Sequence, residues 1–339
     1  MNYNYYGNGV PSGAEYDFYT YQLQEQRKKE KSRVRFVGLT AGGCVIAYVV
    51  LQNIISLPYM FDPLNSLYNF SSEFMMASNI IFSILCLWIP FAVSGRILHR
   101  KGLLAEDYCL GKPVGVPLML TCIPFGFLIC LIGNVVTSSF VGMMETAGVE
   151  LTAPDVSVPE GIIGRLIYVV WVAVVPALIE EFAMRSVVMQ PLRRYGDGFA
   201  IVATAFVFAV LHGNLVQAPF AFIAGAGIGY AVCITNSVWT GVLIHFCNNF
   251  YSVLVDFLLA DVTNEETLNL IWNISQIVLY AVCIAGTVLF IIVKGKRKIS
   301  KSKVSIRTAE KWKAFILNPT MIVAIAIMLY ITADYIKLI

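Results

Sequence analysis

Two glutamates, an arginine and two histidines lie within otherwise uncharged, apolar stretches of this 339-residue chain. They are Glu180, Glu181, Arg185, His212 and His245. Ionisable side chains are costly inside a membrane, by roughly 2.5 to 3.5 kcal/mol each on insertion scales. A chain that places carboxylates and imidazoles there is expected to assemble a polar site able to transfer protons or bind a ligand.

The two glutamates are expected to have different roles. On a helix, Glu181 and Arg185 are four residues apart and share a face, so they can form an ion pair that offsets the cost of burying either charge. Glu180 points about 140° away from Arg185 at 3.6 residues per turn, and it has no partner on its own helix. We therefore assign Glu180 as the candidate general base, with Glu181 and Arg185 in supporting roles.

Each histidine shares a helix face with one residue four positions away: Phe208 with His212, and His245 with Asn249. The Asn249 amide can donate a hydrogen bond to a developing oxyanion. Taken singly, each pattern is equally well explained by a buried structural histidine, and a structural ion pair explains Glu181 and Arg185. The ordered combination on three helices favours one shared site.

The elements that carry these residues are predicted from nine uncharged apolar stretches. About 20 helical residues cross a hydrocarbon core of roughly 30 Å. With 58% hydrophobic and 13% charged residues, the chain is predicted to be an all-α polytopic membrane protein, a bundle of about eight or nine transmembrane helices. The stretch 199–213 is short, and it can instead pair with 218–234 as a shallow hairpin. The nine stretches are 36–58, 74–95, 115–140, 162–191, 199–213, 218–234, 237–258, 267–293 and 314–333.

The distribution of basic residues predicts the orientation. Of the 24 Lys and Arg, all but Arg165, Arg185 and Lys337 lie in the N-terminal region, 96–112, 192–197 and 294–313. The loops 59–73, 141–160 and 259–266 carry acids and no Lys or Arg. Because basic loops stay in the cytosol, we expect a multi-pass cell-membrane protein with a cytoplasmic N-terminus.

We divide the chain into a disordered cytosolic tail, 1–34, and a transmembrane domain, 35–339, with a catalytic core at about 160–260. The 8 cysteines form no CxxC pair and are expected to be small packing residues. The glycines at 225, 227 and 229 are expected to allow close helix packing.

The three motif segments resemble the intramembrane CAAX protease and bacteriocin-processing family (CPBP, also called Abi), whose pattern is EExxxR, FxxxH and HxxxN or HxxxD. The matching residues are Glu180, Glu181 and Arg185; Phe208 and His212; His245 and Asn249. The resemblance covers residues from about 160 to 260. It implies an intramembrane endopeptidase in which a glutamate and two histidines activate water and an asparagine assists. It does not by itself imply prenylated substrates.

The expected function is therefore hydrolysis of membrane-associated proteins or peptides near the cytoplasmic face, in a cavity open toward the basic loops. The expected partners are the lipid bilayer and a peptide substrate, and no nucleic acid. Glu180, His212 and His245 can hold a divalent metal such as zinc or activate water without one, and both options stay open. The alternatives are a non-catalytic immunity or scaffold protein of the same fold, and a proton-coupled transporter.

Overall fold

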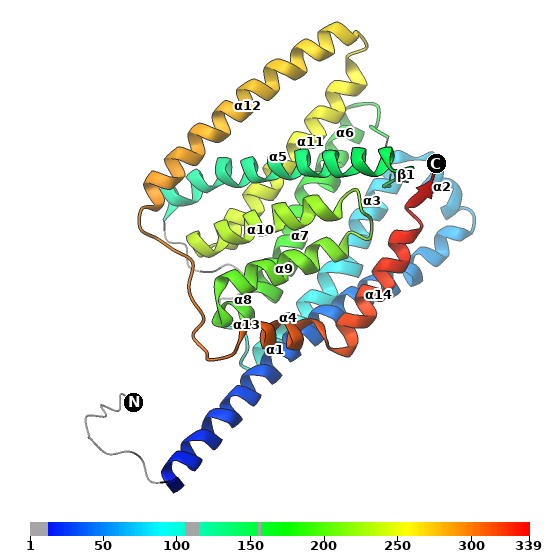
Figure 1. Cartoon of the computed structure of the whole chain (residues 1–339). Coiled ribbons are helices and arrows are strands. Elements are labelled where there is room, and N and C mark those ends of the chain that lie inside the picture. Colours follow the sequence, from blue (N-terminus) through cyan, green and yellow to red (C-terminus); the bar gives the residue numbers. More distant parts are fainter. Residues whose placement is uncertain (1–12, 106–110, 112–114, 155–156) are drawn as a thin grey trace.

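The structure, a computed structural model, describes residues 13–105, 111, 115–154 and 157–339, with side chains from residue 18 onward. Most of these residues are helical (Figure 1). The long helices of the first half are α1 (Gly13–Ser56), α3 (Ser72–Phe82) continued through a π segment into α4 (Ile89–Arg100), and α5 (Val116–Thr146). A 3-10 turn (Leu57–Met60) and α2 (Leu64–Phe70) connect α1 to α3.

The second half begins with a long composite helix that carries the EExxxR motif. It runs from Ile162 to Tyr195 through α6 (Ile162–Val169), a π segment (Val170–Val174), α7 (Val175–Glu181), a second π segment (Phe182–Met189), α8 (Gln190–Leu192) and a 3-10 turn (Arg193–Tyr195). The helices that follow are α9 (Asp197–Leu211), α10 (Ala218–Thr235), α11 (Val238–Asp261), α12 (Glu265–Lys294), α13 (Thr308–Ile316) and α14 (Pro319–Ala333).

The architecture is that of an all-α polytopic membrane bundle, as predicted. Within the described residues, seven helices are long and apolar enough to cross a membrane. The helices α13 and α14 are bent by 69° relative to each other, and if they form one span together, the count is eight. Helix α9 has 15 residues and is shorter than a full span. It packs against α10, the arrangement proposed for these two stretches in the hairpin alternative.

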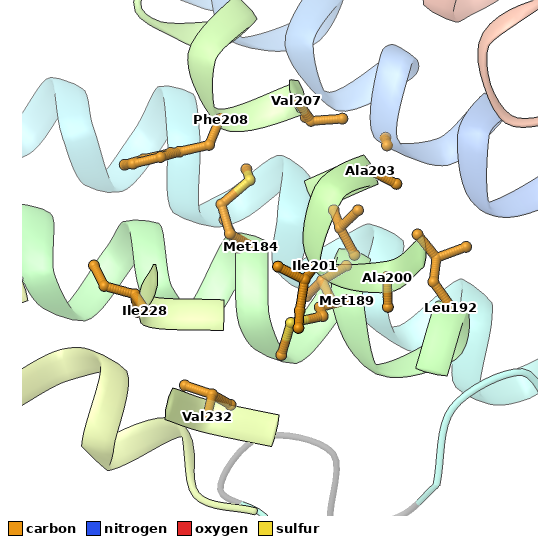
Figure 2. Close-up of a cluster of buried hydrophobic side chains, with 14 of the residues drawn as sticks. Met184, Met189, Leu192, Ala200, Ile201, Ala203, Val207, Phe208, Ile228 and Val232 are labelled. Atoms are coloured by element: carbon orange, nitrogen blue, oxygen red, sulfur yellow. The ribbon is translucent and has the colours of Figure 1, made fainter. Parts of the chain in front are cut away.

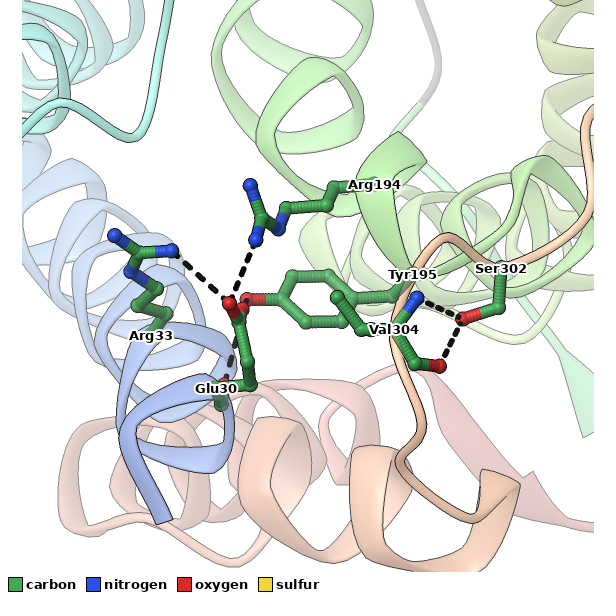
Figure 3. Close-up of polar contacts among 6 residues, drawn as sticks. All are labelled: Glu30, Arg33, Arg194, Tyr195, Ser302 and Val304. Carbon is green, nitrogen blue, oxygen red and sulfur yellow. Dashed lines mark hydrogen bonds and ion pairs between the residues drawn. The ribbon is translucent and has the colours of Figure 1, made fainter. Parts of the chain in front are cut away.

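The N-terminal tail differs from the expectation. Residues 1–12 lie outside the described residues, but residues 13–34, predicted as disordered, form the first part of α1. The segment is rich in Gln, Glu, Lys and Arg, which are good helix formers. Its inner end is held by Glu30, which is only 4% exposed and accepts hydrogen bonds from Arg194 and Tyr195 (Figure 3). The composition of this segment gives no information about its contact with Arg194 and Tyr195, which are distant in the chain.

The basic segments gather at one end of the bundle, which we call the basic end. Arg194 Nη2 lies 2.7 Å from Glu30 Oε1 (Figure 3). The Lys303 N–H donates to the Arg194 carbonyl at 3.0 Å, and Lys31 pairs with Glu310. The loop residue Gly111 lies against Asn236 at the same end. The partition of basic residues inferred from the sequence is thus also a partition in space.

The loops without basic residues meet at the opposite end, which we call the acidic end. There Arg165 donates to Asp261 at 2.6 Å, and Gly164 lies close to Glu73. The acidic end also holds a feature that the sequence did not predict. Strand β1 (Val149–Leu151) pairs antiparallel with β2 (Ile336–Leu338), so a two-stranded sheet joins the loop after α5 to the segment after α14.

The core lies where the composite helix packs against α9 and α10 (Figure 2). Met184, Ile201 and Ile228 are buried there. Small residues permit the close approach, as expected for the glycines of α10. A methyl group on Gly227 would come within 2.6 Å of Ile129, and one on Gly225 within 3.2 Å of Phe208. Close helix contact through small residues is the usual way that membrane helices pack.

Candidate active site

All four candidate catalytic residues line a single cavity of about 500 Å³. Glu180 comes from α7, His212 from the end of α9, and His245 and Asn249 from α11. The supporting residue Phe208 also lines the cavity, whereas Glu181 and Arg185 do not. The structure therefore brings together residues that lie up to 69 positions apart in the chain, on the three helices that the motifs marked.

Glu181 joins Arg185 to His245 behind the cavity wall. Its Oε2 accepts from Arg185 Nε at 2.9 Å, and its Oε1 lies 3.1 Å from His245 Nδ1. Both Glu181 and Arg185 are fully buried. The ion pair predicted from their spacing is confirmed. The contact with His245 was not predicted, because helix periodicity relates residues of one helix and gives no information about a partner 64 positions away.

The contact with Glu181 determines what the other nitrogen of His245 can do. A carboxylate accepts hydrogen bonds, so Nδ1 carries the proton, and Nε2 of a neutral ring is then an acceptor. His245 Nε2 lies 3.8 Å from Glu180 Oε2, which is too long for a direct hydrogen bond. A water that donates one proton to each acceptor fits between them. Glu180 is 21% exposed, so its carboxylate is open to such a water.

The orientation of the His212 ring is determined in the same way. Its Nδ1 lies 2.7 Å from the Phe208 carbonyl oxygen, a pure acceptor, so Nδ1 carries a proton and Nε2 is left for other partners. Asn214 donates to the His212 carbonyl at 3.0 Å and accepts from the Gln217 N–H. The loop after α9 is therefore held rigidly. The Phe208 ring packs edge-on against both imidazoles, with ring centroids 4.7 Å from His212 and 6.1 Å from His245.

Asn249 is oriented by a proline in the composite helix. Pro176 has no N–H, so the carbonyl of Val172, four residues earlier, lacks its usual α-helical donor. Asn249 Nδ2 donates to this carbonyl at 3.0 Å. Its Oδ1 accepts from Asn248 Nδ2 at 3.1 Å. Each amide group retains a second N–H, so the expected donor role of Asn249 is compatible with this orientation.

The three candidate metal ligands do not form a metal-binding group in this arrangement. Among the described residues, no set of three or more His, Cys, Asp or Glu side chains is placed to hold a metal ion. The donor set as arranged here does not fit a metal, and the chemistry below is derived without one.

The direction of the cavity corrects the sequence-based expectation. Its lining includes Pro154 and Tyr335, at the acidic end, and no described residue of the basic segments 96–112, 192–197 and 294–313. The expected opening toward the basic loops is therefore wrong. The reason is that α9 starts at the basic end and rises about 22 Å over 15 residues before reaching His212. The side of the membrane on which the site lies depends on the orientation of the chain, which this lining does not determine.

Several lining residues were missed by sequence reasoning. Asn248 is three residues from His245 and shares its helix face, so its spacing was available as a signal. Tyr48 and Gln52 lie four residues apart on α1, a helix without a motif. Nothing in the sequence indicates that α1 forms a wall of this cavity. Of the cysteines within the described residues, Cys247 is half-buried and the other six are buried and unpaired, as expected for packing residues.

Comparison with known protein families matches the segment that contains the motifs. The family model described as type II CAAX prenyl endopeptidase Rce1-like matches residues 162–251. Comparison with curated proteins and with solved structures gives no match. The matched segment runs from the start of α6 into α11 and contains every motif residue from Glu180 to Asn249. The resemblance of this chain to the CPBP family, which the motifs predicted, is thereby confirmed for residues 162–251.

Proposed function

We propose that this protein is a membrane-embedded endopeptidase that hydrolyses peptide bonds in the cavity between α7, α9 and α11. The observation that carries the proposal is the position of Glu180 beside His245, with His212 and Asn249 on the same cavity wall. His245 is itself oriented by the buried Glu181. A base, a second imidazole and an amide donor around one space are the parts that amide hydrolysis needs.

The proposed reaction begins with a water bridging Glu180 and His245 Nε2. Glu180 takes one proton as the water oxygen bonds to the peptide carbonyl carbon. The carbonyl π electrons move to its oxygen, and the second amide hydrogens of Asn249 and Asn248 stabilise this oxyanion. Collapse of the intermediate breaks the C–N bond, and the proton held by Glu180 passes to the leaving amine, directly or through His212 Nε2. The products are a carboxylic acid and an amine, and transfer of the acid proton to the amine gives a carboxylate and an ammonium ion, so atoms and charge balance.

The substrate is proposed to enter from the acidic end. Pro154 and Tyr335 line that part of the cavity, whereas the basic end is closed by the network around Glu30 and Arg194. If the basic end is cytoplasmic, as the distribution of Lys and Arg indicates, the peptide reaches the site from the opposite side of the membrane. This orientation and the peptide substrate are part of the proposal.

The purified protein and a peptide panel test the proposal. The panel contains unmodified apolar peptides, prenylated peptides and soluble polar peptides, and cleavage is followed by mass spectrometry with and without a chelator. We expect the protein to cleave at least one apolar peptide, and to do so also in the presence of the chelator. Cleavage that is abolished by the chelator and restored by zinc would show that the reaction uses a metal and would contradict the metal-free chemistry. Binding without cleavage of any peptide would favour the immunity or scaffold alternative, and proton flux across vesicles would favour a transporter.

A further inference from the structure

The sheet at the acidic end has a free edge. The register pairs Val149 with Leu338 and Leu151 with Ile336. The ladder continues at both ends, because the Thr152 N–H donates to the Tyr335 carbonyl and the Ile339 N–H donates to the Gly148 carbonyl. Within the described residues the sheet has two strands only, so the outer side of β2 pairs with no third strand.

The backbone groups on that edge can be identified from the register. In an antiparallel ladder, hydrogen-bonded pairs alternate with non-hydrogen-bonded pairs. Tyr335 and Ile339 bond toward β1, and so does Lys337 between them. The N–H and C=O groups of Ile336 and Leu338 therefore point away from β1. Outside the sheet, no described residue makes a backbone hydrogen bond to these four groups. The edge is accessible, since Leu338 is 86% exposed.

One end of this edge joins the active-site cavity. Tyr335 directly precedes β2, Pro154 follows β1 by three residues, and both line the cavity. Ile331, in the last turns of α14, lines it as well. The end of the sheet marked by Leu151 and Ile336 is thus continuous with the cavity wall. A chain segment laid along β2 would have one end directed into the space that contains Glu180 and His212.

We propose that β2 binds the peptide substrate by strand addition, with an extended segment of substrate as a third strand beside Ile336 and Leu338. This inference rests on the proposed peptidase function. The physical reason is that a peptide entering a membrane-embedded cavity loses water from its backbone, and each unpaired N–H or C=O there is costly. An exposed strand edge supplies these partners independently of side-chain identity.

The side chains of β2 define the class of substrate. Ile336 and Leu338 lie on the same face, because side chains alternate along a strand. A paired peptide places every second side chain beside them. The site therefore favours an extended segment with apolar residues at two positions separated by one residue. Lys337 and its cross-strand partner Glu150 lie on the other face, where polar substrate residues are compatible.

Binding measurements test this inference separately from cleavage. The probe is a fluorescein-labelled dodecapeptide with Leu or Val at alternate positions and Ser or Lys between them. Its dissociation constant is measured by anisotropy on the full chain carrying Glu180→Gln. In that background, Leu338→Pro removes one edge N–H, a change tolerated at edge strands. The matched control, Leu338→Val, retains the N–H and an apolar side chain.

We expect Leu338→Pro to weaken binding about five- to tenfold, the effect of one lost hydrogen bond, and Leu338→Val to change it by less than about twofold. A second arm, which needs no edge variant, uses peptides N-methylated at single positions, and binding should weaken at every second position. Equal effects of Pro and Val, no alternation in the methylation series, or no binding of the probe would overturn the inference. A peptide that binds with these signatures but is never cleaved would contradict the peptidase function alone.

Discussion

At the scale of single residues, the site depends on an unequal pair of neighbours. Glu180 faces the cavity, whereas Glu181 is fully buried and each of its oxygens accepts from a different donor, Arg185 or His245. The two carboxylates are adjacent in sequence but point to opposite sides of the cavity wall. One is available for chemistry, and the other holds an imidazole and a guanidinium in place.

This division predicts different effects on stability. Glu181→Gln places an amide N–H₂ group against one of two donors and leaves Arg185 as a buried charge without its counter-charge. We expect a loss of about 3 to 5 kcal/mol, as measured for broken buried pairs, visible as a lower midpoint of thermal unfolding in detergent. Glu180→Gln should leave the midpoint within about a degree of the unmodified protein. Equal losses in both variants would contradict the division of roles.

The residue roles show what spacing can and cannot predict. Spacing of four residues predicted the contact of Glu181 with Arg185, which the structure contains. It also paired Phe208 with His212 and His245 with Asn249, and these four residues line the same cavity. It could not predict that Glu181 also orients His245, because that contact joins different helices. It also missed the Val172 carbonyl that binds Asn249, since this contact depends on Pro176, which has no N–H to donate to that carbonyl.

At the scale of secondary structure elements, the position of Glu181 depends on how closely α11 approaches the composite helix. Gly241 of α11 faces Glu181, and a methyl group there would lie 2.6 Å from Glu181 Oε2 and 2.9 Å from Val232. The neighbouring side chain is itself held by Arg185 and His245 and cannot move freely. A glycine at this position is therefore required by the ion-pair network.

We expect Gly241→Ala to destabilise the protein by about 1 to 3 kcal/mol, the usual cost of overpacking, and to lower turnover by displacing Glu181 and His245. Gly43→Ala is the matched control, because a methyl group on that α1 glycine meets nothing within 4 Å. It should be neutral or slightly stabilising, as glycine in a helix interior is unfavourable. Unfolding midpoints and cleavage rates of both variants check this. A neutral Gly241→Ala would mean that the helices separate at low cost.

The sequence predicted the apolar helices but missed one polar helix and the sheet. The nine apolar stretches are helical apart from short ends, because length and hydrophobicity are strong local signals, but 314–333 is broken between α13 and α14. The helix over 13–34 was missed because it is polar and depends on a distant contact at Glu30. The β1–β2 sheet was missed because each strand has three residues, too few for a visible alternation.

At the scale of the whole molecule, the bundle has two ends of different charge and one cavity between them. The basic end is held together by Glu30, Arg194 and Tyr195, and the acidic end carries the sheet and the cavity's lining residues Pro154 and Tyr335. The sequence predicted which loops share an end. It did not predict toward which end the cavity extends, because that depends on where α9 stops.

Single-cysteine labelling on a Cys-free background tests the orientation. We expect an impermeant maleimide added to intact cells to label Asn69→Cys at the acidic end and to leave Ser300→Cys at the basic end unlabelled. Both positions are exposed, so permeabilised cells should label both and provide the control. Strong labelling at residue 300 in intact cells would reverse the orientation, and with it the side from which substrate enters.

The central claim, that Glu180 activates water for peptide hydrolysis, is tested most directly by single-turnover cleavage in reconstituted vesicles. The comparison is between the unmodified protein, Glu180→Gln and Glu266→Gln, which removes an exposed carboxylate of α12 far from the motif. We predict that Glu180→Gln lowers the cleavage rate by about 100-fold or more, the usual contribution of a general base, while Glu266→Gln cleaves at the unmodified rate. Cleavage by folded Glu180→Gln at a rate close to that of the unmodified protein would contradict the account.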